Sequence, residues 1–526
     1  MSVRYRTKQT IYQVIFTLVL LSLPIRAAVG AASPLWGELE PGPYAVGFEN
    51  VEKYDYSRVY RDKYDYDGNI RSEEVARPIQ IYIWYPASAE AETPSMVYGE
   101  YAFAAPEDNR FYPLLAGLQG REAGYAIPFL AQSRGLLQDL MNMNVTAFKD
   151  APREQGEFPL IIYHPDAIGG ISQNAVLCEY LASYGFIVAT SHALGAQTLN
   201  AGMDAVGLET MIRDREFVYG HMRDYPQVDN NKPGLLGVGT GGLSALLMQM
   251  RNTDIEAVAA LDGIFTYNYG IRLGTEFANY SVARADAPIL QMYIADHDSL
   301  DLSLVDSLRF SRRLLFAVSE RDRNDFTLYP FAGALLADTS AERVRSIEAF
   351  YGRLCETVRE FFEVFLKGDD LESKAFVSSA PDTFWPVTYS LKEGEIPPPT
   401  ERQFVEMIQE DKIERAIEIY EQLKKTRPGY VFFQEATMNG LGYQLLQQNR
   451  LGEARMIFRM NTEAFPNSAN VWDSYADACL ASGDTETAIT CYQKVLEVLP
   501  SDSAVGPQVR EILQNNATQG LEQLQQ

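Results

Sequence analysis

The sequence predicts an α/β domain with a mostly parallel sheet and helices on both faces, followed by an all-α domain built of repeats. Strand-like and helix-like runs alternate from residue 42 to about residue 369, which is typical of a parallel sheet covered by helices. Most of the strand-like runs after the first are continuously apolar, as in strands buried on both faces. Beyond residue 400 the chain has only helix-like runs, in which similar residues recur at a fixed spacing.

The first domain is expected over residues 40–393. A Tyr-rich stretch, residues 54–66, precedes Asp67-Gly68, which favours a hairpin at the front edge. Residues 87–157 are rich in Tyr, Ala and Glu and predict a helical cap inserted between the first two strands. Residues 341–366 carry apolar side chains at helical spacing and predict a late helix that closes the sheet. The strands are predicted at residues 79–84, 160–163, 186–190, 235–237, 258–261 and 289–293.

A linker is expected at residues 394–400, where GEIPPP cannot continue a helix. The repeats are expected at residues 401–512, followed by a polar tail at 513–526. Four pairs of residues lie 34 positions apart, and an earlier copy with Ala416, Tyr420 and Pro428 keeps the internal spacing. This is the period of tetratricopeptide repeats, which the region resembles. The resemblance implies stacked helix pairs that contact a protein partner. The four pairs are Ala454/Ala488, Phe458/Tyr492, Pro466/Pro500 and Met438/Trp472.

The first 32 residues predict a cleavable export signal. A basic start is followed by an apolar run, residues 14–23, and by small residues at 27–32. No later segment is long enough to cross a membrane. We therefore expect a periplasmic or extracellular protein with no integral membrane segment in the mature chain. Removal of the four basic residues of the signal changes the formal charge from −25 to −29 (−25 − 4), which disfavours nucleic acid as a partner.

A glycine-rich turn, residues 237–242 (GVGTGG), lies between an apolar strand and a helix. Two motifs fit it. If the turn is a nucleophile elbow, G-x-S-x-G, its two outer glycines are present, but Gly239 occupies the position of the serine. In a dinucleotide fingerprint, G-x-G-x-x-G, the acidic residue is Asp262, at the end of the next strand-like run. The local pattern leaves both interpretations open.

Longer runs favour the first interpretation. They are residues 42–47 (GPYAVG), 77–86 (RPIQIYIWYP), 158–165 (FPLIIYHP), 169–170 (GG) and 178–189 (CEYLASYGFIVA). Together they resemble the dienelactone hydrolase and platelet-activating factor acetylhydrolase branch of the α/β-hydrolases, over about residues 42–369. The resemblance implies the α/β-hydrolase fold, ester or lipid substrates and no cofactor. It disfavours dinucleotide binding, because the fingerprint normally opens its own βαβ unit.

The resemblance assigns the catalytic positions residue by residue. Gly239 occupies the nucleophile position, Asp262 the position of the acid, and Arg323, before Asn324-Asp325-Phe326, the position of the histidine base. An arginine keeps its proton and cannot act as a general base. Two of the three catalytic groups are therefore replaced, and we expect an ion pair between Arg323 and Asp262 instead.

The family's oxyanion loop corresponds to His164, Gly169 and Gly170, with the backbone N–H of Thr240 as the second donor. Thr240 is also the one substitute nucleophile at the turn. His164 and His192 follow predicted strands and are expected to be structural, and His221 receives no role. His297, between two aspartates, is a weak metal candidate, and we expect no metal site.

The sequence thus predicts an exported α/β-hydrolase-fold protein that is catalytically degenerate, a pseudoenzyme of the carboxylic ester hydrolase class. It would act as a binding module, with a small acyl or apolar ligand in its pocket and a protein partner on its repeats. One alternative is an active ester or lipid hydrolase that uses a displaced catalytic set. Another is a dinucleotide-binding protein.

Overall fold

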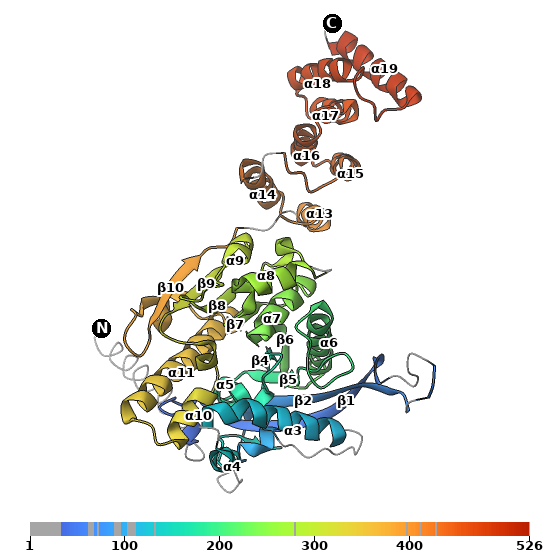
Figure 1. Ribbon diagram of the computed structural model, residues 1–526. Coiled ribbons are helices and arrows are strands. Elements are labelled where there is room, and N and C mark those ends of the chain that lie inside the picture. Colours follow the sequence, from blue (N-terminus) through green and yellow to red (C-terminus); the bar gives the residue numbers. More distant parts are fainter. Residues whose placement is uncertain are drawn as a thin grey trace, which may run out of the picture. The chain divides into compact units, whose positions relative to one another are not determined.

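The computed structural model describes residues 33–61, 68–70, 73–88, 96–102, 112–130, 133–277, 280–395, 398–410, 412–426 and 429–524. The predicted export signal and the tip of the predicted hairpin, residues 62–67, lie outside these residues. The chain forms two compact units, Met1–Glu395 and Ile396–Gln526, so the division falls inside the expected linker (Figure 1).

The first unit is built on a mixed, mostly parallel sheet. Its strands follow the order β10-β9-β8-β7-β6-β4-β5-β2-β1-β3, in which β5, β4 and β6 to β9 are parallel. β1 and β2 form a long antiparallel hairpin that extends beyond the rest of the sheet (Figure 1). The strands are β1 (Ala45–Arg61), β2 (Val75–Ala87), β3 (Phe148–Lys149), β4 (Phe158–His164), β5 (Ile187–Ser191), β6 (Val228–Val238), β7 (Ala257–Leu261), β8 (Ile289–Ile294), β9 (Arg313–Val318) and β10 (Val387–Lys392).

All six predicted strands are present, because their apolar runs are buried on both faces of the sheet. β9, β10 and the two-residue β3, which lies inside the expected helical cap, were not predicted, and β1 was expected only as one side of a hairpin. β10 lies at the sheet edge and buries only alternate residues, which gives a weak apolar signal. The predicted late helix is α11 (Ala341–Phe362), and it continues into a wider helical turn, Glu363–Lys367, that ends at Gly368 with φ +82°.

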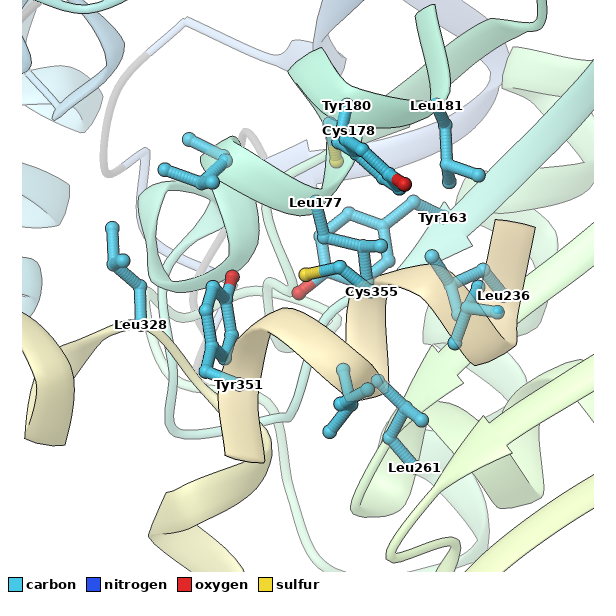
Figure 2. Close-up of a cluster of buried hydrophobic side chains, with 14 of the residues drawn as sticks. Tyr163, Leu177, Cys178, Tyr180, Leu181, Leu236, Leu261, Leu328, Tyr351 and Cys355 are labelled. Carbon is cyan, nitrogen blue, oxygen red and sulfur yellow. The ribbon is translucent and has the colours of Figure 1, made fainter. Parts of the chain in front are cut away.

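Helices cover both faces of the sheet. The helices of the first unit are α2 (Gly99–Ala102), α3 (Tyr112–Ala126), α4 (Arg134–Met141), α5 (Ala175–Ser183), α6 (Ala205–Met222), α7 (Thr240–Arg251), α8 (Asn268–Thr275), α9 (Ser303–Ser307), α10 (Tyr329–Leu336), α11 and α12 (Ala375–Ser378). On one face α5 and α11 pack in a core in which Leu177, Cys178, Leu236, Tyr351 and Cys355 meet (Figure 2). On the other face α6 and α7 bury residues such as Ile212 and Leu246 against β4 to β7.

The second unit consists of helices that repeat at the predicted spacing. They are α13 (Glu401–Gln409), α14 (Ile413–Thr426), α15 (Glu435–Gln447), α16 (Leu451–Ala464), α17 (Ala469–Ala481), α18 (Thr485–Val498) and α19 (Pro507–Leu524). The pair α15–α16 and the pair α17–α18 are offset by 34 positions at both ends of both helices (469 − 435 and 498 − 464).

Residues 513–524, expected as a polar tail, instead belong to α19. Leu513 and Ala517 are one helical turn apart and buried, and Leu521 packs against the same core. The tail is therefore amphipathic, and its apolar stripe covers the end of the array. Among the residues that the structure describes, no helix is both long and apolar enough to span a membrane.

Candidate functional site: a filled nucleophile elbow

Gly239 forms the sharp turn between β6 and α7. Its φ of 57° and ψ of −119° confirm the strained backbone that the elbow motif predicts, a region that favours glycine. The turn is fixed by its backbone, since the N–H of Gly239 donates to the Leu261 carbonyl at 3.0 Å and its carbonyl accepts from Ile264 at 3.1 Å. Gly241 and Gly242 are needed for close packing, because a Cβ would lie 2.0 Å from the carbonyl oxygen of His164 and 2.7 Å from Cα of Gly263 respectively.

Asp166 fills the space in which the nucleophile's side chain would lie. A Cβ on Gly239 would be 2.2 Å from Oδ2 of Asp166. The other carboxylate oxygen, Oδ1, accepts a hydrogen bond from the Thr240 hydroxyl at 2.7 Å, and that hydroxyl accepts one from the N–H of Ala167, also at 2.7 Å. The loop after β4 therefore closes over the elbow.

Arg323 joins the two acidic residues of the site. Its Nη2 lies 3.5 Å from Oδ2 of Asp166, and its Nε lies 3.6 Å from Oδ2 of Asp262. The predicted pairing of Arg323 with Asp262 is thus present, and Asp166 adds a second partner. Both carboxylates are buried, whereas 46% of the arginine side chain is exposed. The guanidinium covers two buried carboxylates from the solvent side.

Burial raises the pKa of Asp262 to about 6, while the Tyr267 hydroxyl, which donates to Oδ1, and the charge of Arg323 act in the opposite direction. Burial also works against the charge of Arg323, but Asp166 and Asp262 outweigh it and raise the pKa of the guanidinium. Arg323 therefore stays protonated and accepts no proton from a nucleophile.

The two glycines of the predicted oxyanion loop are packed against other side chains. The space beside Gly169 is taken by the Gln173 side chain and that beside Gly170 by Glu122 of α3. Glu122 accepts hydrogen bonds from the N–H of Ile171 at 2.9 Å and from the Ser172 hydroxyl at 2.5 Å. The cap helix α3 thereby holds this loop in place.

Among the described residues, no histidine makes a hydrogen bond or ion pair with Asp166, Thr240 or Asp262. Nδ1 of His164 lies 3.0 Å from the Ser244 hydroxyl, and His192 pairs with the Tyr82 hydroxyl at 3.0 Å. Burial lowers the pKa of both imidazoles well below the usual value, so they are neutral. His297 accepts from the backbone N–H of Ser299, and His221 lies on α6. No group of three metal-binding side chains occurs among the described residues.

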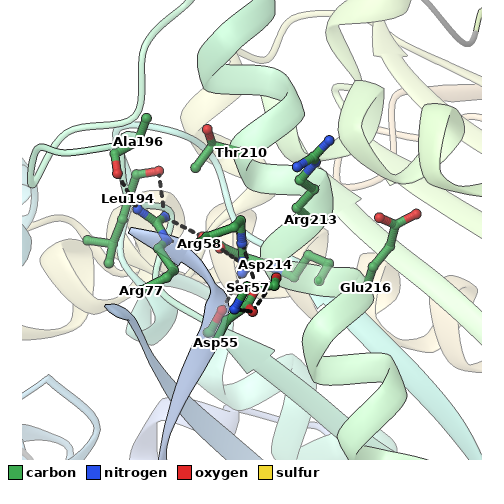
Figure 3. Close-up of polar contacts among 12 residues, drawn as sticks. Asp55, Ser57, Arg58, Arg77, Leu194, Ala196, Thr210, Arg213, Asp214 and Glu216 are labelled. Carbon is green, nitrogen blue, oxygen red and sulfur yellow. Dashed lines mark hydrogen bonds and ion pairs between the residues drawn. The ribbon is translucent and has the colours of Figure 1, made fainter. Parts of the chain in front are cut away.

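A groove away from the elbow has a volume of about 640 Å³. It is lined by residues that include Arg58, Arg77, Thr210, Arg213 and Phe277. Beneath it, Asp214 of α6 accepts from Nε of Arg77 at 3.1 Å and pairs with Nη2 of Arg58 at 2.9 Å (Figure 3). Nε of Arg58 also pairs with Asp55 at 2.6 Å, so two carboxylates balance two guanidinium groups and the cluster ties the hairpin to α6.

The strand order and the elbow between β6 and α7 define an α/β-hydrolase-fold protein. No protein-family model and no curated protein matches the chain. Among solved structures, a ferulic acid esterase from Streptomyces cinnamoneus is similar with a TM-score of 0.46 and 17% identity, covering 69% of this chain and 98% of that one. The fold assignment rests on the strand order of this chain.

The sequence analysis assigned four of the residues that meet here to the candidate site: Gly239, Thr240, Asp262 and Arg323. It missed Asp166, although a signal was available. Asp166 follows β4 by two residues, and β4 is the parallel neighbour of β6, so both loops leave the same edge of the sheet. The Asp262 carboxylate is engaged by Tyr267 and Arg323, which leaves it unlike the open acid of a dinucleotide site.

Proposed function

We propose that the first unit is a catalytically degenerate member of the dienelactone hydrolase and platelet-activating factor acetylhydrolase branch, which binds a ligand or partner rather than hydrolysing esters. The observation that carries this proposal is the Asp166 carboxylate in the place of the nucleophile's side chain. Ester hydrolysis in this fold requires a nucleophile, a base that takes its proton, and open space for the acyl group above the turn. Here Gly239 has no side chain, Arg323 holds its proton, and the Asp166 carboxylate lies where the nucleophile's side chain would be.

The proposal extends to the setting of the protein. The first 32 residues support export to the periplasm or the cell exterior, and the 34-residue offset of the helix pairs supports a tetratricopeptide-like array. We infer that the array contacts a protein partner, while a small acyl or apolar ligand is the class of ligand that the hydrolase resemblance suggests for the first unit. Neither role requires a metal or a cofactor.

One observation favours a second candidate, an active hydrolase with a displaced catalytic set. The hydroxyl of Thr240 donates to a carboxylate at 2.7 Å, which is the geometry of a nucleophile with its base. Against this, the same hydroxyl accepts the N–H of Ala167, and Thr240 is buried. An attacking oxygen needs access to the carbonyl carbon, which the burial of Thr240 denies, so we favour the degenerate site.

Labelling of the mature chain, residues 33–526, with a fluorophosphonate probe separates the two candidates, together with turnover of a p-nitrophenyl ester. The expected result is equal background in the native protein, in Thr240→Val and in Asp166→Asn. The control is Thr210→Val, which removes a helical hydroxyl bonded to the Val206 carbonyl, away from the elbow. Labelling of Thr240 in the native protein and its loss in Thr240→Val, but not in Thr210→Val, would overturn the proposal.

A further inference from the structure

Helices α15, α17 and α19 lie next to one another in the second unit and form one row. Polar side chains connect neighbouring helices along this row. The Tyr443 hydroxyl of α15 donates to Oδ2 of Asp477 on α17 at 2.9 Å, and Nδ2 of Asn516 on α19 reaches Oδ2 of Asp473 on α17 at 3.4 Å. These contacts mark the face that the row presents, which we name the α15–α17–α19 face.

The charge of these three helices is one-sided. They carry five acidic residues and one basic residue, whereas α16 and α18 carry both signs. The single basic residue, Arg510, forms a hydrogen bond within the unit, since its Nη2 donates to the backbone carbonyl of Asp502 at 2.6 Å. The acidic residues are Glu435, Asp473, Asp477, Glu511 and Glu522.

Asp473 is a carboxylate without an adequate partner. It is 7% exposed, its Oδ1 has no hydrogen-bond partner among the described residues, and its Oδ2 has only the long contact with Asn516. Burial and the neighbouring charge of Asp477 raise the pKa of Asp473 to about 6. Within the described part of the chain, no Lys or Arg nitrogen lies within 4.0 Å of either aspartate. A buried carboxylate in this state gains from a cation supplied by another molecule.

An exposed apolar pair continues the same face. Val509 and Ile512 are 47% and 57% exposed on α19. They are three residues apart, and Asn516 follows Ile512 by four, so the three side chains share one side of the helix. Since Asn516 contacts Asp473, the apolar pair lies beside the acidic row. A partner segment that fits this face combines a positive charge with an apolar side chain.

We propose that the α15–α17–α19 face binds an extended segment of a partner protein in which lysine or arginine residues lie beside an apolar residue. The inference rests on the proposed role of the repeats in partner binding, and it adds the chemistry of that partner. Stacked helix pairs present extended surfaces of this kind, and charge complementarity selects the partner and speeds association.

The test uses the mature full-length chain and three labelled peptides of equal length, measured by fluorescence anisotropy. One contains lysine and leucine, one has glutamate in place of lysine, and one has serine in place of leucine. Asp473→Asn/Asp477→Asn removes two charges from the face with little change in shape. Glu486→Gln/Glu497→Gln on α18 removes the same charge outside the row and is the matched control.

We expect the lysine-leucine peptide to bind most tightly, with an affinity that falls with added salt, and to bind about tenfold more weakly to Asp473→Asn/Asp477→Asn than to the control variant. Equal affinity for the lysine and glutamate peptides overturns the inference but leaves partner binding by the repeats intact. Equal losses in the two double variants show a general charge effect and also overturn it, as does the absence of binding by all three peptides. Ester turnover reports separately on the first unit.

Discussion

Replacement of Gly239 by serine completes the G-x-S-x-G motif of a nucleophile elbow, and we expect it to destabilise the fold without producing an esterase. The new Cβ would lie 2.2 Å from Oδ2 and 2.9 Å from Cγ of Asp166, and 3.1 Å from Nη2 of Arg323. The carboxylate therefore has to move. Its movement breaks the hydrogen bond with the Thr240 hydroxyl and loosens the ion pair with Arg323.

The expected loss of folding stability is the sum of two contributions. A non-glycine residue at a φ of 57° and a ψ of −119° costs about 1–3 kcal/mol. Loss of a hydrogen bond to a charged group costs about 1.5–3 kcal/mol. We therefore expect the free energy of unfolding of the first unit to fall by about 2.5–6 kcal/mol, as measured by urea denaturation. Gly239→Ala carries the same Cβ without the hydroxyl, and we expect a similar loss.

A double variant tests the cause. In Gly239→Ser/Asp166→Ala the space above the turn is free, so the combined loss of stability should be smaller than the sum of the two single losses. Additive losses would mean that Asp166 is not what the new side chain meets. Turnover of a p-nitrophenyl ester by Gly239→Ser above the level of Gly239→Ala would mean that a base is within reach, and it would refute the assignment of Arg323.

Three further variants probe the charges. The folded-state pKa of Asp262 lies above its ordinary value, so its stabilising contribution is complete below about pH 3.8 and is lost as the pH rises through about 6. Relative to Asp262→Asn, the native protein should therefore gain up to about 3 kcal/mol between pH 7 and pH 4 in urea titrations, and a flat difference would contradict this. Arg323→Met should cost about 1 kcal/mol at pH 7, because the arginine is partly exposed, and less at pH 5; a loss that grows on acidification would contradict the pairing. Glu122→Gln should cost about 1–3 kcal/mol and speed hydrogen exchange at the Ile171 amide, whereas unchanged exchange would separate α3 from the loop.

Five of the six strands that the sequence predicted are parallel strands, and the sixth, β2, is antiparallel to both of its neighbours but almost entirely buried. Parallel strands at the centre of the sheet are buried on both faces, so each is a short apolar run that is visible without its neighbours. β1 was not predicted as a strand because its 17 residues are mostly half-exposed and many are polar. They are held in place by pairing with β2 rather than by burial alone. The extension of α19 was missed for a related reason. The segment is mostly polar, and its few apolar residues form a stripe that is buried only by packing on the preceding helices.

The site was predictable wherever a backbone conformation or a family position determines a residue. The glycine-rich turn specifies a strand-to-helix elbow through φ at Gly239 and through the close packing of Gly241 and Gly242, and both are local properties. The partner of Arg323 was predictable because Asp262 follows the neighbouring strand. Asp166 was missed although it follows β4 much as Asp262 follows β7, because its role depends on a contact with Thr240, 74 residues later.

Asp166 also explains why the other two replacements belong together. Its carboxylate fits over the elbow only if residue 239 has no Cβ, which requires glycine there. Its negative charge raises the pKa of Asp262, and a neutral histidine at position 323 would leave two buried carboxylates facing each other without a cation. An arginine supplies the permanent positive charge that both need, and its reach spans the two oxygens at 3.5 and 3.6 Å. Gly239, Asp166 and Arg323 therefore form one interdependent arrangement, in which the carboxylate above the turn requires glycine at position 239 and is paired with Arg323.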